Sequence, residues 1–261
     1  MNRYPVLEEY WNLQRERRPP AEAARRADPQ GYHSRLRAIL GSAHETLAAQ
    51  LAPERFRLNR RRHWLSRRSD GLTHRIAFTT SGENIPDVFT ALYVHFWVIY
   101  PPIADWRHAA GRAHWEYLSI RHLNSFEPDE ASIEHDIGPP SQREAELGDI
   151  LARMRRNGLP YFEQFRDRQA TLQSALAWPD GGFAWHEISA AVEFALFVNE
   201  RGIAQTLVGR FFETYPSLSL AYREFATGER IHPSSSGPDV FAHDLAELVR
   251  SHGLEHPKAA V

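Results

Sequence analysis

Apolar and polar positions follow a strand-like pattern on both sides of a short turn in the first third of the chain. The run Arg57–Arg68 sets Trp and Leu among basic residues, and the run Leu72–Thr80 is rich in Leu, Thr, Ile and Phe. Between them, Asp70-Gly71 supplies residue types that tolerate the positive φ angles of a tight connection. The pattern predicts a β-hairpin formed by these two runs.

The most apolar stretch of the chain is Val88–Tyr100, which is 13 residues long and ends at Pro101-Pro102. A membrane-spanning helix needs roughly 20 apolar residues, so this stretch is too short to cross a bilayer. Its enrichment in Val, Phe, Tyr, Trp and Ile favours a strand that is buried on both faces or nearly so. We expect it to be the centre of a sheet.

Two later runs, Glu116–Leu123 and Ala131–Ile137, predict a further pair of strands, because the turn-forming segment Asn124–Asp129 separates them. Together with the hairpin and the apolar strand, they predict an antiparallel sheet of about five strands. A meander is the simplest topology for it.

Helical patterns lie on both sides of this region. Before it, apolar residues suit a short helix at Pro5–Arg18, which we expect Pro19-Pro20 to stop, and a second helix at about Gln30–Leu51. After Gly138, Ser141 and Glu144 have the spacing of a capping box that begins a helix. Further helices are predicted at Tyr161–Ala177, Trp185–Asn199, Ile203–Thr214, Leu218–Ala226 and Val240–Ser251.

These elements predict an α+β fold, in which an antiparallel sheet is covered by N-terminal helices and followed by a C-terminal helical bundle. The character of the sequence changes near residue 138. We therefore expect an N-terminal α+β region at residues 1–138 and a helical region at residues 139–261, either as two domains or as one continuous domain.

Charge is unevenly distributed, although the whole chain of 261 residues has a net charge of −2. Eight arginines within Arg55–Arg75 oppose one acidic residue, and eight acidic residues within Glu127–Asp149 oppose one arginine. The acidic segment would attract a basic protein partner if it forms a separate surface. If it faces the basic segment, the two neutralise each other within the fold. The candidate partner-binding residues are Glu127, Asp129, Glu130, Glu134 and Asp136.

The basic segment allows a second interpretation, since arginines and an aromatic residue together are typical of proteins that bind single-stranded nucleic acid. Strand alternation would divide Arg60 and Arg62 from Arg61 onto opposite faces, which makes the patch smaller. An edge strand protected by charge explains the same residues, and we prefer that explanation. The alternative basic patch consists of Arg57, Arg60, Arg62, Trp64 and Arg67.

The sequence offers little for catalysis or for binding a cofactor. It has no cysteine, which excludes disulfides, thiolate zinc sites and cysteine nucleophiles, and it contains no GxSxG, GxGxxG or GxxxxGK[ST] motif. His108 and His114 are six residues apart, and the residue four after His186 is Ala190, so neither spacing suits a zinc site. We expect no catalytic residue, no metal and no cofactor.

An unrecognised carboxylate and histidine site in a cleft between sheet and helices is an alternative that the sequence leaves open. Its candidate residues are Glu116, Glu134, Asp136, Glu187, His122 and His135.

The layout resembles an uncharacterised bacterial family, domain of unknown function 4304. The resemblance rests on FRLNRRRHWLSRR, HRIAFTTSG, TALYVHFWVIY and NGLPYFEQF, which fall within Leu47–Ala177, about half of the chain. Members of that family resemble immunity or accessory proteins that bacteria encode beside secreted toxins, which implies a binding role. The arginine-rich first strand and the helices after Trp178 depart from the family pattern.

We therefore expect a cytoplasmic protein that binds another protein without catalysis, specifically an immunity protein that neutralises a cognate toxin. Nucleic-acid binding is the first alternative. No membrane association is expected, because the most apolar stretch is too short to span a bilayer. Residues 1–20 carry charged residues and no apolar core, so they do not form a secretory signal and the cytoplasm is the expected location.

Overall fold

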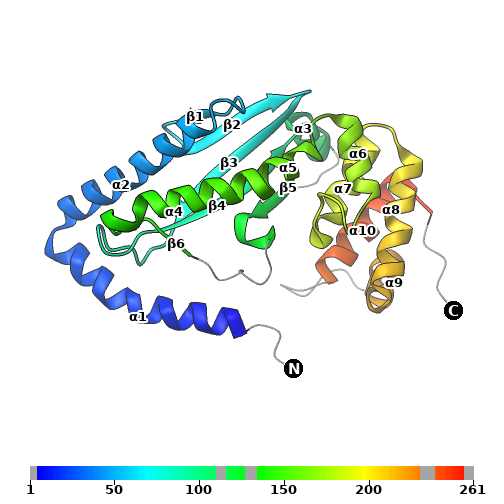
Figure 1. The fold of residues 1–261 in the computed structure, drawn as a ribbon. Coiled ribbons are helices and arrows are strands. Elements are labelled where there is room, and N and C mark those ends of the chain that lie inside the picture. Colours follow the sequence, from blue (N-terminus) through cyan, green and yellow to red (C-terminus); the bar gives the residue numbers. More distant parts are fainter. Residues whose placement is uncertain (1–4, 110–115, 127–133, 230–238, 256–261) are drawn as a thin grey trace. The chain divides into compact units, whose positions relative to one another are not determined.

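The computed structural model describes residues 5–109, 116–126, 134–229 and 239–255, and it has the predicted α+β fold (Figure 1). The sheet is antiparallel and open, and its strand order is β1-β2-β3-β4-β5, with β6 paired to β4. Its six strands in the described residues are β1 (Arg57–Asn59), β2 (Trp64–Ser69), β3 (Leu72–Thr80), β4 (Ala91–Ile99), β5 (Tyr117–His122) and β6 (His135–Asp136).

The predicted turn at Asp70-Gly71 joins β2 to β3. Asp70 has a φ of 46° and Gly71 a φ of 79°, the left-handed values that a two-residue hairpin connection requires at both positions. This hairpin prediction is confirmed.

The single strand predicted at Arg57–Arg68 is wrong, because the chain turns back within it and forms β1 and β2. Asn59 begins the turn. Its side-chain oxygen and its backbone oxygen both accept a hydrogen bond from the backbone N–H of Arg62, at 3.1 and 3.2 Å, and such local bonds compete with strand pairing. The predicted division of Arg60 and Arg62 from Arg61 onto opposite faces of a strand therefore does not occur. All three arginines are exposed in one turn.

β4 is the centre of the sheet, as predicted, since it pairs with β3, β5 and β6. Leu92 lies opposite His135, so β6 joins β4 rather than forming a hairpin with β5. Of the strand predicted at Ala131–Ile137, only His135 and Asp136 are in a strand among the described residues, and residues 131–133 lie outside them. Burial differs between the faces of β4: Leu92, Val94, Phe96 and Val98 are fully buried, whereas Tyr93, His95 and Trp97 are half-buried.

Two long helices precede the sheet, α1 (Pro5–Ala27) and α2 (Pro29–Gln50). The prediction that Pro19-Pro20 stops the first helix is wrong. The two prolines remove backbone N–H donors, but the next seven residues, AEAARRA, are mostly strong helix formers, and Ala21 is buried. The break comes at Asp28, whose side chain accepts a hydrogen bond from the N–H of Gly31 at 2.9 Å and caps α2.

α2 packs on one face of the sheet, because the ring of its His44 stacks on Phe78 of β3. Beside it lies α4 (Pro140–Arg153). The capping box predicted for this helix is wrong, since α4 begins at Pro140, with Pro139 at the N-cap position and no side-chain cap. A proline at the first helical position is already in the helical φ range and lacks only a hydrogen bond that the helix end would not make.

α4 continues through a π-helical turn, Met154–Gly158, into α5 (Leu159–Glu163). Phe162 of α5 stacks on His74 of β3 with ring centroids 4.7 Å apart, which fixes this helix against the sheet. The predicted helix at Tyr161–Ala177 is therefore split. α6 (Arg168–Leu176) starts anew after Asp167, whose side chain accepts a hydrogen bond from the N–H of Ala170 at 2.7 Å.

Gly158 allows the helix to approach the sheet closely. A Cβ atom at this position would lie 2.1 Å from Cε1 of Phe96, which is fully buried. Gly158→Ala is expected to lower the free energy of unfolding by roughly 1–3 kcal/mol through overpacking, measured by urea denaturation. Adding Phe96→Leu should recover part of the loss by making room. An unchanged urea midpoint for Gly158→Ala would contradict this packing.

The remaining helices lie mostly within two or three residues of their predicted positions, with short 3₁₀ turns before two of them. They are α7 (Ile188–Phe197), α8 (Arg201–Thr214), α9 (Ser219–Thr227) and α10 (Asp239–His252). α7 packs on α8, and α9 packs on α10. The unpredicted helix is α3 (Pro101–Ala109), which follows β4 directly.

The chain divides into two compact units that alternate along the sequence. The first contains residues 1–68, 73–97 and 120–162, and the second contains residues 69–72, 98–119 and 163–261. The boundary predicted at residue 138 falls within the first unit, and the assignment of domains stays a prediction. Within the described residues, no helix combines the length and apolar character needed to cross a membrane.

Candidate functional site

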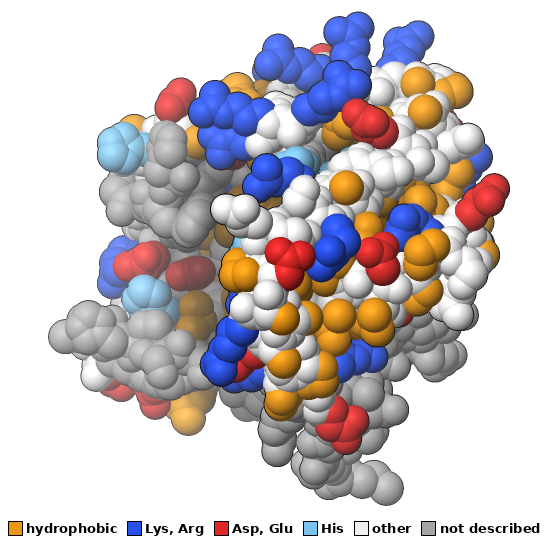
Figure 2. Space-filling view, turned by 90° about the vertical axis from the view of Figure 1, so that its left-hand side faces the viewer, with side chains coloured by type: hydrophobic (Ala, Val, Ile, Leu, Met, Phe, Trp, Pro, Cys, Tyr) orange, Lys and Arg blue, Asp and Glu red, His pale blue; other side chains and the backbone are white. Residues whose placement is uncertain are grey.

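A cluster of exposed arginines in the first unit lies on β1, just before it and in the turn that follows it. Arg55, Arg57, Arg60, Arg61 and Arg62 are all exposed, and we call these five residues the arginine cap. Figure 2 shows arginine side chains at the top of the view, at the level of β1 and β2 in Figure 1. Because β1 is an edge strand, the arginine cap is carried by the outer rim of the sheet.

Few contacts within the fold use these guanidinium groups. Arg60 Nε lies 3.2 Å from Glu45 Oε1, and both side chains are exposed. Arg62 lies over the ring of Trp64, 6.0 Å from its centroid. Among the described residues, neither Arg57 nor Arg61 takes part in an ion pair. The turn therefore presents strong, planar hydrogen-bond donors to the solvent.

Two members of the predicted basic patch, Arg67 and Trp64, are half-buried and contact other side chains of the fold. Arg67 is half-buried, donates a hydrogen bond to Nδ1 of His74 at 3.2 Å and lies 5.0 Å from the ring centroid of Phe56. Trp64 is half-buried too, and the guanidinium of Arg75 lies 3.7 Å from its ring centroid. The structure thus places Arg57, Arg60 and Arg62 on the exposed rim, with Trp64 beside Arg62 and covered by Arg75, whereas Arg67 is directed into the fold.

The predicted acidic site is only partly described, since Glu127, Asp129 and Glu130 lie outside the described residues. Glu134 accepts a hydrogen bond from the Tyr93 hydroxyl at 2.8 Å and pairs with Arg17. Asp136 Oδ1 accepts hydrogen bonds from the backbone N–H groups of Thr90 and Gly138 at 2.8 and 2.9 Å. These two carboxylates support the junction of β4 and β6.

The histidines that sequence analysis weighed as site residues have separate partners. The His122 ring lies 4.0 Å from that of His95, and burial lowers the pKa of both; for His95 the value is about 4. His135 is buried, and its Nε2 lies 3.5 Å from Nη1 of Arg153, which is also buried. Burial, then the charge of Arg153, lowers the pKa of His135 to about 4, although Asp149 acts in the opposite direction.

Among the described residues, the one grouping with the spacing of metal ligands is His243, Asp244 and Glu247 on α10. It is a partly exposed group on one helical face, where acidic residues are common without a metal. His108, whose spacing from His114 was considered for zinc, does not join it, nor does the candidate carboxylate Glu116. His114 lies outside the described residues.

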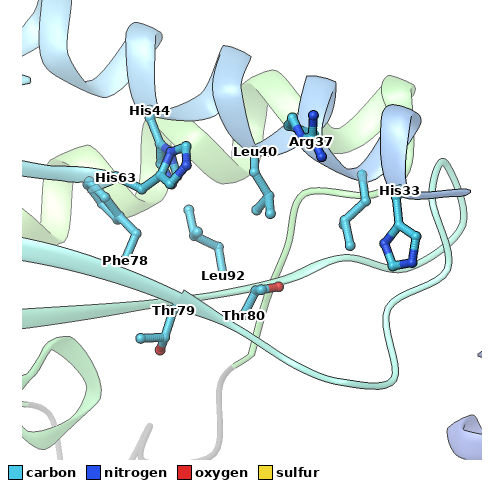
Figure 3. Close-up of a pocket in the computed structure, with 10 residues that line it drawn as sticks. His33, Arg37, Leu40, His44, His63, Phe78, Thr79, Thr80 and Leu92 are labelled. Carbon is cyan, nitrogen blue, oxygen red and sulfur yellow. The ribbon is translucent and has the colours of Figure 1, made fainter. Parts of the chain in front are cut away.

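A cavity of about 310 Å³ lies between α2 and the strands β3 and β4, next to the arginine cap (Figure 3). We call it the α2 pocket. Leu36, Leu40, Phe78 and Leu92 form its apolar wall, and His33, Arg37, His44, His63, Thr79 and Thr80 complete its lining. Its volume is at the small end of the range of ligand sites, which is roughly 300–1,000 Å³.

His44 is the unusual residue of the α2 pocket. Its side chain is buried, its ring centroid lies 5.3 Å from that of His63, and neither ring nitrogen has a hydrogen-bond partner. Burial, and then the proximity of His63, lowers its pKa to about 4. A neutral imidazole has one donor and one acceptor nitrogen, and here neither forms a hydrogen bond.

The α2 pocket was not predicted from the sequence, because it depends on how a helix lies on a sheet. One signal was present: His44 interrupts the apolar face of the helix predicted at Gln30–Leu51, at helical spacing from Arg37 and Leu40. A buried polar residue on such a face needs a partner.

Comparisons with family models, with curated proteins and with solved structures find no match to this chain. The resemblance to domain of unknown function 4304 therefore stays a prediction.

Proposed function

We propose that this protein acts by binding an acidic protein partner through the arginine cap. The observation that carries the proposal is the exposed turn Arg60–Arg62, which presents three consecutive guanidinium groups on an edge of the sheet. Arginine is enriched at protein interfaces, since its planar fork forms paired hydrogen bonds with carboxylates.

The backbone beneath the arginine cap is already ordered, which favours binding. The hydrogen bonds that the Arg62 N–H donates to Asn59 fix the turn, and the pairing of Leu58 with Leu65 fixes the strands below it. Ordering a loop during binding costs free energy. A turn that is held in place in the free protein avoids most of that cost.

An acidic protein fits this surface better than a nucleic acid does. The net charge of −2 lacks the excess of basic residues that is usual in nucleic-acid-binding domains. Proteins that hold single strands also stack bases on aromatic rings, and Arg75 lies over the ring of Trp64 at 3.7 Å, where a base would stack.

The specific form of the proposal is that the partner is a toxin encoded by a neighbouring gene. The resemblance to an immunity-like family, the lack of recognisable catalytic motifs in the sequence and the segregation of charge support it. Co-expression with the neighbouring gene product should restore growth to cells that this product otherwise inhibits. A neighbour that is neither toxic nor bound would remove this form of the proposal.

Reversing the charge of the turn tests the surface itself. The triple substitution Arg60→Glu, Arg61→Glu and Arg62→Glu is expected to weaken binding of the captured partner by about a hundredfold, measured by calorimetry, since each lost contact costs roughly 1 kcal/mol. Binding by the unchanged protein should also weaken as salt is raised.

Two matched variants serve as controls. Arg60→Lys, Arg61→Lys and Arg62→Lys keep the charge and should lose far less affinity. Arg18→Glu, Arg26→Glu and Arg35→Glu change the net charge equally at exposed sites on α1 and α2, outside the cap, and should bind normally. Equal loss in this second control, or tight binding of single-stranded RNA or DNA with a steep salt dependence, would count against the proposal.

A further inference from the structure

We propose that the α2 pocket binds a small hydroxylated carboxylic acid, with its carboxylate at Arg37, its apolar body between Leu40 and Leu92, and its hydroxyl at His44. The inference is independent of the arginine cap. It rests on three features of the lining: an apolar middle, a buried histidine without a partner at one end, and an exposed guanidinium at the other.

The apolar middle suits a hydrocarbon body. Leu40 of α2 faces Leu92 of β4 across the cavity, and the ring of Phe78 closes one side (Figure 3). Leu36 of α2 also lines the cavity. Apolar area removed from water contributes roughly 25 cal/mol per Å². A flexible chain or a single ring would gain contact area here, and a volume of about 310 Å³ limits it to a small molecule.

At the buried end of the α2 pocket, His44 would bind a neutral polar group. Both nitrogens of His44 lack a hydrogen-bond partner, although only 4% of the residue is exposed. Leaving such groups unpaired costs free energy in the free protein. Because the pKa of about 4 keeps the ring neutral near pH 7, it favours a hydroxyl, which donates and accepts, over an anion.

At the open end of the α2 pocket, Arg37 would bind an anion. In Figure 3, Arg37 and His33 lie at the opposite end of the pocket from His44 and His63, with Leu40 and Leu92 between them. Arg37 is exposed and has no ion-pair partner among the described residues. Its guanidinium is always charged and matches the two oxygens of a carboxylate. A molecule with a hydroxyl at one end and a carboxylate at the other fits this arrangement.

Three probes that differ only at their ends test each contact. They are ω-hydroxyoctanoate, which has both groups, octanoate, which lacks the hydroxyl, and octanol, which lacks the carboxylate. Calorimetry is expected to show tightest binding of ω-hydroxyoctanoate, with losses of about tenfold for each missing group. Equal affinities for all three probes, or no binding of any at millimolar concentration, would overturn the proposal.

Single substitutions test separately whether His44 binds the hydroxyl and whether Arg37 binds the carboxylate. His44→Phe keeps the ring and its stacking on Phe78, and should reduce the affinity for ω-hydroxyoctanoate about tenfold while leaving that for octanoate unchanged. Arg37→Gln should weaken both acids about tenfold and leave octanol unchanged. Arg35→Gln, on the same helix but outside the lining, is the matched control and should bind all three probes normally.

A variant that fills the cavity checks the location. Leu40→Trp should abolish binding of all three probes, and chemical shifts of backbone amides in the unchanged protein should move on α2, β3 and β4. If Leu40→Trp fails to fold, Leu36→Trp replaces it. Binding that survives the filled pocket, or shift changes confined to other elements, would overturn the proposal.

Discussion

Acidification from pH 7 to pH 5 is expected to destabilise this protein strongly, because three histidines are held neutral inside the fold. The pKa values of His44, His95 and His135 are each lowered from 6.5 to about 4, mainly by burial. His63 adds to the effect at His44, His122 at His95 and Arg153 at His135.

The direction of the effect follows from proton binding. Between pH 6.5 and about 4, these histidines are protonated in the unfolded chain and neutral in the folded protein, so the unfolded state binds more protons. Stability is therefore complete above pH 6.5 and is lost as the pH falls toward 4. Glu146 acts in the opposite direction, since burial and neighbouring carboxylates raise its pKa. It is one group against these three histidines and His122, whose pKa burial also lowers.

The expected loss is of the order of 4 kcal/mol by pH 5, after allowance for the half-exposed His95. Because domains are stable by roughly 5–15 kcal/mol, a loss of this size moves the thermal midpoint by many degrees. Urea denaturation monitored by circular dichroism at several pH values measures it. His44→Phe removes one of the three protons and should reduce the slope of stability against pH by about a third.

A stability that is flat between pH 7 and pH 5 would contradict this account. So would a His44→Phe variant with an unchanged slope. The same variant is expected to be more stable than the unchanged protein at pH 7, because phenylalanine has no nitrogen to leave without a partner.

Removing either member of the buried ion pair in the second unit should cost about 3–5 kcal/mol. Arg107 of α3 and Glu193 of α7 are both buried, and the Arg107 Nε and Nη2 atoms each lie 2.7 Å from Glu193 Oε2. Arg107 Nη1 also donates a hydrogen bond to the backbone oxygen of Tyr117 at 3.0 Å. Each substitution leaves the opposite charge buried without its counter-charge.

A double-mutant cycle separates the pair from its surroundings. Arg107→Met and Glu193→Met should each lower the free energy of unfolding by several kcal/mol, whereas the double variant should lose much less than their sum. Glu193→Gln keeps an acceptor for Arg107 and should lose less than Glu193→Met. Strictly additive losses, or single losses below about 1 kcal/mol, would show that the pair behaves like a surface contact.

Local signals predicted much of the fold. Asp70-Gly71 identifies the β2-β3 hairpin because few residue types adopt positive φ in succession, and the apolar run around β4 identifies the central strand because its composition suits burial. The C-terminal helices follow from apolar residues at helical spacing.

The errors fall where one residue type has two structural meanings. Pro101-Pro102 ends β4 and also begins α3, and Pro19-Pro20 lies inside α1 because strong helix formers follow it. Asn59 turns the chain within a run that otherwise has the composition of a strand. In each case the residue was identified as a possible break, but the residues around it determined whether the helix or strand ended there.

The candidate site was predicted in part. The arginines were identified from sequence, but their distribution over two faces was wrong, since it depended on a strand that the turn at Asn59 interrupts. The α2 pocket could not be predicted, because Arg37 and Leu92 are far apart in sequence and meet only when α2 lies on the sheet.

The pairing of β6 with β4 has a consequence for how the chain folds. The turns between β1, β2 and β3 are short, so the loops that must close are small and these hairpins are expected to form on the microsecond scale. β6 reaches β4 only after a long excursion from Leu92 to His135, and contacts of high sequence separation form late. The arginine cap therefore belongs to the part of the sheet that assembles first.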